Sequence, residues 1–124
     1  MNYLIDTHVL IWWLTGNPRL NEKCHDILQT KIVWCSVVSL WEIMIKEQLG
    51  KITIPKTFMT DVKVYGFIWL DVDFKHIDAL GRLPLIHKDP FDRLLISQAL
   101  SEELVFITAD SNIRRYNVPV MMAG

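Results

Sequence analysis

The chain has 124 residues, of which 51% are hydrophobic, and its formal net charge is −1. This length and composition predict a single globular domain, residues 1–124, with a sizeable core and no disordered tail. A nearly neutral chain argues against a protein that coats nucleic acid non-specifically, although it does not exclude a local basic groove.

Cysteine usage argues against an exported protein and against a structural zinc site. Cys24 and Cys35 are too few for a disulfide framework or for four zinc ligands. With no signal sequence, we interpret them as reduced thiols of a cytoplasmic protein. The apolar run at residues 9–14 is too short to cross a membrane, so no membrane partner is expected.

The first predicted element is the apolar strand Tyr3-Leu4-Ile5, which runs directly into Asp6. An uninterrupted apolar strand suits the middle of a parallel sheet that is covered on both faces. Ligands of open α/β sheets bind at the carboxyl ends of the strands, which is where Asp6 lies. Taken alone, however, Asp6 is explained more simply as a cap of the helix that follows.

Strand and helix patterns alternate along the rest of the chain. Apolar periodicity predicts helices at residues 9–14, 22–28, 40–49, 58–65, 74–81 and 90–99, with a helical turn at 113–116. β-rich runs predict strands at residues 32–35, 67–70, 104–107 and 118–121. This alternation predicts a three-layer α/β/α fold with a mainly parallel central sheet of four to five strands.

Three further acids accompany the predicted element ends. Glu42 follows Ser39 by three residues, as in a capping box, and therefore lies in the first turn of its predicted helix. Asp89-Pro90 is typical of a helix start, which puts Asp92 in the first turn of the next helix. Asp110 follows the fourth predicted strand, and it could cap the short helical turn after it.

Four carboxylates thus converge on one rim of the predicted sheet: Asp6, Glu42, Asp92 and Asp110. Each has a capping explanation, but like charges gathered on one rim repel unless a cation lies between them. Carboxylate-only clusters suit a hard divalent cation such as Mg²⁺ or Mn²⁺, and the natural chemistry is hydrolysis of a phosphate ester. The histidines show no paired spacing that favours zinc, although His8 and His87 are expected near the rim.

Four segments of the chain resemble the motifs of PIN-domain ribonucleases, in particular those of the VapC-like toxins. They are Ile5-Asp6-Thr7-His8, Ser39-Leu40-Trp41-Glu42, His87-Lys88-Asp89-Pro90-Phe91-Asp92-Arg93 and Thr108-Ala109-Asp110. The resemblance implies an endoribonuclease that depends on Mg²⁺ or Mn²⁺, is commonly a homodimer, and is held inactive by a cognate antitoxin. The residues it implies as catalytic and metal-binding are Asp6, Glu42, Asp92 and Asp110, with Thr108 as a supporting hydroxyl. Asp89 remains the helix cap.

Substrate RNA would need positive charge near the acids. The candidate residues for this role are Lys46, Lys88, Arg93 and Arg114. Ordinary solvated surface explains each of them equally well.

Other proteins that place acids on a sheet rim fit this sequence less well. A response-regulator receiver needs an acidic pair after its first strand, and a haloacid-dehalogenase-type phosphatase needs a second Asp where His8 stands. An alternative function is that of a non-catalytic binding module. In such a module every acid would be a helix cap, and the Trp residues would bind a partner protein. Trp12 and Trp13 point about 100° apart on a helix, so we expect part of this pair in a dimer or antitoxin interface.

Overall fold

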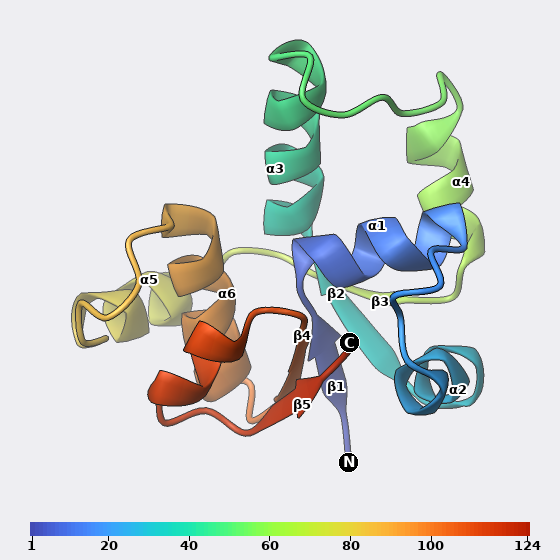
Figure 1. The fold of residues 1–124 in the computed structure, drawn as a ribbon. Helices are drawn as coiled ribbons and strands as arrows, with labels where there is room; N and C mark the ends of the chain where they lie inside the picture. Colours follow the sequence, from blue (N-terminus) through green and yellow to red (C-terminus); the bar gives the residue numbers. More distant parts are fainter.

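A five-stranded sheet, parallel throughout, organises the computed structural model, which describes residues 1–124 (Figure 1). The strands are β1 (Tyr3–Ile5), β2 (Val33–Ser36), β3 (Ile68–Leu70), β4 (Val105–Thr108) and β5 (Val120–Met122). Their order across the sheet is β3-β2-β1-β4-β5. The predicted parallel sheet is confirmed, and β5 lies at an edge of it, directly after Pro119, where a residue without a backbone donor is tolerated.

Six α-helices and one 3₁₀ helix connect the strands. They are α1 (Thr7–Thr15), α2 (Glu22–Thr30), α3 (Val37–Gln48), α4 (Phe58–Val64), α5 (Phe74–Gly81), α6 (Pro90–Ser101) and η1 (Ser111–Arg115). Every predicted element is present, and its ends differ from the predicted ones by at most three residues. None of the helices is both long enough and apolar enough to cross a membrane.

The core is divided between the two faces of the sheet, because successive side chains of a strand point to opposite faces. Tyr3 and Ile5 of β1 pack into one apolar cluster with α1, α2 and α4. Leu4 packs into the other with α6 and η1. Figure 1 shows α1, α2 and α4 on one side of the strands and α5 and α6 on the other. The predicted three-layer α/β/α arrangement is therefore confirmed.

Strand β1 lies at the point where the strand order reverses. The chain passes from β1 outward to β2 and β3, and then returns to the other side of β1 to form β4. Connections leave the sheet in opposite directions there. In open α/β sheets this arrangement marks the crevice where ligands bind, at the carboxyl ends of the strands, here those of β1 and β4. Asp6 lies at this point, directly after β1. Its amide donates to the carbonyl oxygen of Ile107 in β4 at 3.0 Å.

The start of α3 corrects one prediction. Ser36, not Ser39, caps this helix: its hydroxyl accepts from the amide of Val38 at 3.1 Å. Ser39 lies inside the helix, so the capping box of Ser39 with Glu42 is wrong, and Glu42 lies in the second turn. The reason is that strand β2 ends directly at Ser36, so the helix has already begun before the second serine.

This start of α3 is testable by mutation. Ser36→Ala is expected to lower the free energy of unfolding by about 1 kcal/mol, because the amide of Val38 loses its acceptor. Urea denaturation, followed by circular dichroism, measures the change. A Ser36→Ala protein as stable as the wild type would mean that α3 is capped elsewhere.

Candidate metal centre

Asp6 and Thr108 tie together the ends of β1 and β4. One carboxylate oxygen of Asp6 accepts from the amide of Val9 at 2.8 Å and so caps α1. The other oxygen accepts from the hydroxyl of Thr108, which itself accepts from the amide of Asp110 at 3.1 Å. Burial raises the pKa of Asp6 above its usual range, although the hydrogen bonds from Thr108 and Val9 oppose this change.

Glu42 reaches the same rim from α3. Its side chain is almost fully buried. The hydroxyl of Thr7, the first residue of α1, donates to its Oε1 at 2.7 Å, and the ammonium of Lys46 lies 3.1 Å from its Oε2. Both carboxylate oxygens are therefore held by neighbouring groups, and the charge of Glu42 is partly balanced.

Asp92, Asp110 and His87 form the more open part of the rim. The Nε2 atom of His87 lies 2.8 Å from Asp92 Oδ2 and 3.4 Å from Asp110 Oδ2. Ligand atoms from all three residues lie within 4.8 Å of one another. The three side chains are half-buried, with 20–36% of their surface exposed. One cation could therefore contact all three while remaining open to solvent.

The pKa of Asp92 depends on burial and on the charges of other acids near the rim. Its pKa is raised to about 6, firstly by burial and then by the negative charge of Asp89, whereas the hydrogen bond with His87 lowers it. The charges of Asp6 and Glu42 raise it further. The carboxylates of Asp6 and Glu42, which lie on separate elements, are therefore close enough to Asp92 to act on its charge.

Comparison with protein families decides what kind of domain this is. The family description "PIN domain" matches residues 3–119 of the chain. The chain belongs to the PIN-domain family.

Solved structures share the fold of this PIN domain at low sequence identity. VapBC2 from Rickettsia felis, bound to a promoter DNA fragment, has a TM-score of 0.76 at 15% identity, and the match covers 98% of each chain. DNA-bound VapBC from Salmonella typhimurium has a TM-score of 0.76 at 17% identity, over 100% of this chain and 99% of that one. FitAcB from Neisseria gonorrhoeae has 0.69 at 18%, over 98% and 96%. No curated protein matches this PIN domain.

The predicted basic residues differ in where the fold puts them. Lys46 lies at the site through its contact with Glu42. The guanidinium of Arg93 is engaged elsewhere, because it donates to the carbonyl oxygens of Leu83 and Pro84. Lys88 and Arg114 are exposed and form no ion pair within the chain, so both remain free to contact a substrate.

His87 is the residue that sequence reasoning undervalued. Its position near the rim was expected, but ligand spacing gave it no place among metal-binding residues. The loop before α6 brings it there, and its amide donates to the hydroxyl of Tyr116 at 2.7 Å, which holds the loop in place. The available signal was its place five residues before Asp92, in the segment that opens this helix.

The donor set of the PIN domain suits a hard divalent cation. It consists of carboxylate oxygens, with the imidazole of His87 beside them, whereas both cysteines are buried elsewhere in the core. Oxygen-rich sites favour Mg²⁺ or Mn²⁺, and an imidazole ligand is also compatible with Mn²⁺. The raised pKa of Asp92 is the expected sign of negative charge that a cation would balance.

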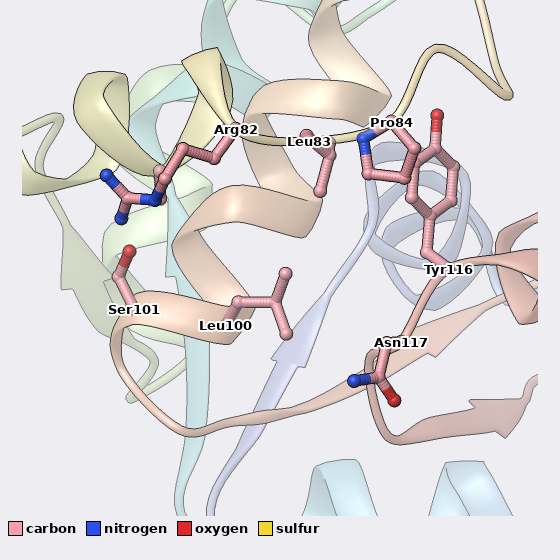
Figure 2. A pocket seen from close by; sticks show the side chains of 8 residues that line it. Arg82, Leu83, Pro84, Leu100, Ser101, Tyr116 and Asn117 are labelled. Atoms are coloured by element: carbon pink, nitrogen blue, oxygen red, sulfur yellow. The ribbon is translucent and has the colours of Figure 1, made fainter.

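A separate pocket of about 340 Å³ lies between α5, α6 and the segment after η1 (Figure 2). Arg82, Leu83, Leu100 and Tyr116 are among the residues that line it. None of its lining residues is a carboxylate or a histidine, so it cannot hold the metal. Its wall nevertheless supports the site, because Tyr116 also binds the amide of His87.

The raised pKa of Asp92 predicts how its charge affects stability. An Asp whose pKa is about 6 in the folded state and 3.8 otherwise destabilises the fold above pH 6, and this cost disappears as the pH falls towards 4. In chelator, Asp92→Asn is therefore expected to be more stable than the wild type at pH 8, by roughly 1–3 kcal/mol. The gain should vanish near pH 4.

Thermal unfolding at a series of pH values measures this difference. Asp26→Asn is the matched control, because Asp26 is exposed on α2, away from the acids, and its replacement should change little at any pH. Loss of stability in Asp92→Asn at pH 8 would refute the interpretation.

Proposed function

We propose that this PIN domain is a metal-dependent endoribonuclease that hydrolyses RNA phosphodiester bonds and acts as the toxin of a toxin–antitoxin pair. The carrying observation is the group at the start of α6, where ligand atoms of Asp92, Asp110 and His87 lie within 4.8 Å of one another. Burial, and then the charges of Asp89, Asp6 and Glu42, raise the pKa of Asp92 in this group. Two of the proposed metal-binding acids, Glu42 and Asp92, have no capping role in the structure, since Ser36 and Asp89 cap their helices. Helix capping therefore does not account for the cluster.

Asp6, Glu42, Asp92 and Asp110 would hold the cation, with His87 at its edge. A bound Mg²⁺ or Mn²⁺ supplies an activated water and stabilises charge on the leaving oxygen. The chain's own groups prepare this site: Thr108 orients Asp6, and Thr7 orients Glu42.

Binding of the RNA backbone is assigned to basic side chains around the acids. We propose Lys46, Lys88 and Arg114 for this role. Lys88 and Arg114 are exposed and unpaired, so both can reach phosphate groups. Lys46 would assist from the side of Glu42. Arg93 supports the loop that carries His87 through Tyr116, to which both contribute hydrogen bonds.

The proposed partners are a cognate antitoxin and a second copy of the chain. The solved structures with this fold include a toxin–antitoxin complex from Klebsiella pneumoniae. On this chain, Trp12 and Trp13 are half-buried, and Trp13 packs against the rings of His25 and Tyr65. Because neither ring is fully enclosed, the proposal that part of the pair contacts a partner protein stands.

The competing function is a non-catalytic binding module. Two observations favour it: Asp6 caps α1 and Asp110 caps η1, so both have a purely structural use. Under that proposal, replacement of Glu42 or Asp92 would leave every activity of the protein intact.

A direct assay of the wild-type protein, freed of any partner, tests the proposed function. We expect it to cut single-stranded RNA in Mg²⁺ or Mn²⁺, to stop in excess chelator, and to resume when the metal is restored. The products are separated on a sequencing gel, with Asp92→Asn as the matched inactive protein. Failure to cut RNA in either metal would overturn the proposal.

Substitutions of Glu42 distinguish a role in metal-dependent cleavage from a role in the stability of the fold. Glu42→Gln keeps an oxygen that can accept from Thr7, so near-native thermal stability is expected, yet most ribonuclease activity should be lost with the charge. Glu42→Ala should lose activity as well and additionally cost on the order of 1 kcal/mol, because the hydroxyl of Thr7 loses its buried acceptor.

The matched control is Glu47→Gln, an exposed glutamate of the same helix, which should cut RNA normally. Normal cleavage by Glu42→Gln would reduce the proposed site to three acids.

A further inference from the structure

An exposed aromatic ring stands next to the acids. Trp41 is 58% exposed and belongs to neither of the two apolar clusters that form the core. A tryptophan side chain is large and mostly apolar, so leaving it in water forgoes the free energy that burial would provide. The ring therefore contributes little to the core of the fold.

Trp41 and its neighbour Phe91 each directly precede a proposed metal-binding residue in the sequence. Trp41 precedes Glu42 in α3, and Phe91 precedes Asp92 in α6. The two rings meet with their centroids 4.9 Å apart and their planes inclined by 73°. The aromatic pair therefore joins the two helices that contribute these acids.

Phe91 gives the exposed ring a fixed orientation. Phe91 is half-buried and packs against the apolar cluster beneath α6. Its amide donates to Asp89 Oδ1 at 2.8 Å, which fixes the first turn of the helix. Because its contact with Trp41 is nearly perpendicular, Phe91 orients the indole ring without stacking flat on it. The indole ring is therefore not covered by a parallel ring, and more than half of its surface remains exposed.

We propose that Trp41, oriented by Phe91, stacks on an unpaired nucleobase of the RNA next to the phosphodiester that is cut. This inference rests on the proposed ribonuclease function and adds a substrate-binding residue to it. Aromatic side chains bind single strands by stacking on bases, with little dependence on sequence. Stacking also provides attraction that does not depend on charge, which matters at a rim whose carboxylates repel phosphate groups.

The proposal has a consequence for substrate choice. A base inside a duplex already stacks on its neighbours, so it must leave the helix before it can reach the indole ring. We therefore expect single-stranded RNA to be cut in preference to duplex RNA, and we expect this preference to depend on Trp41.

Three variants test the role of the ring. Trp41→Leu keeps an apolar side chain but removes the flat ring, and it is expected to raise KM for a single-stranded RNA about tenfold, with kcat changed by less than about twofold. Trp41→Phe retains a ring and should restore most of the affinity. Leu49→Ala removes an exposed apolar side chain from the end of the same helix, and it should leave both constants unchanged.

A second measurement identifies the base itself. On a defined RNA that the wild type cuts, each base near the cleavage point is replaced in turn by an abasic nucleotide. One position should raise KM for the wild type and have no additional effect in Trp41→Leu, because the ring and the base are then lost together. A purely structural role for Trp41 would give the same abasic penalty in both proteins.

Each remaining result counts against a particular proposal. If the wild type cuts RNA and Trp41→Leu has an unchanged KM, the stacking role is wrong while the ribonuclease proposal stands. If Trp41→Leu alters the molar mass measured by light scattering, the ring lies in an interface between copies of the chain, and the stacking role is again refuted. If the wild type does not cut RNA, both proposals fail.

Discussion

Repulsion between carboxylates is the constraint on which the rest of this structure depends. Three of the four acids are stabilised by groups close to them. Asp6 accepts hydrogen bonds from an amide and a hydroxyl. Glu42 accepts one from a hydroxyl and pairs with an ammonium, and Asp110 accepts one from an amide. The side chain of Asp92 has a hydrogen bond only with His87, and the pKa of this acid is raised to about 6. The unbalanced charge of the site is thus concentrated at the start of α6, in the part most open to solvent.

Most of the fold was predictable because its determinants are local. Unbroken apolar runs such as Tyr3–Ile5 mark strands that are buried on both faces, and their alternation with helices implies a parallel sheet. The start of α3 was not predictable, because Ser36 and Ser39 have equal capping ability and only the end of β2 selects between them. Neighbouring strands in the sheet could not be assigned either, since strand order depends on contacts between distant segments.

The same distinction explains the site. Convergence of the acids follows from one geometric rule, that strand ends and the following helix starts share an edge, so it could be predicted from element order alone. The roles of His87 and Arg93 could not be predicted from element order. His87 reaches Asp92 through the path of a loop, and Arg93 binds carbonyl oxygens of the turn before that loop. Spacing along the chain does not give the path of this loop or of this turn, so it does not predict either contact.

The central position of β1 also determines when the crevice can form during synthesis. Both strands that pair with β1 are made after it, and the hydrogen bond from Thr108 to Asp6 joins residues 102 positions apart. A nascent chain therefore carries its first acid on a strand without partners, since contacts between distant segments form slowly and late. The ribosome must release β4 before the two halves of the rim can meet, so an incomplete translation product lacks an assembled crevice.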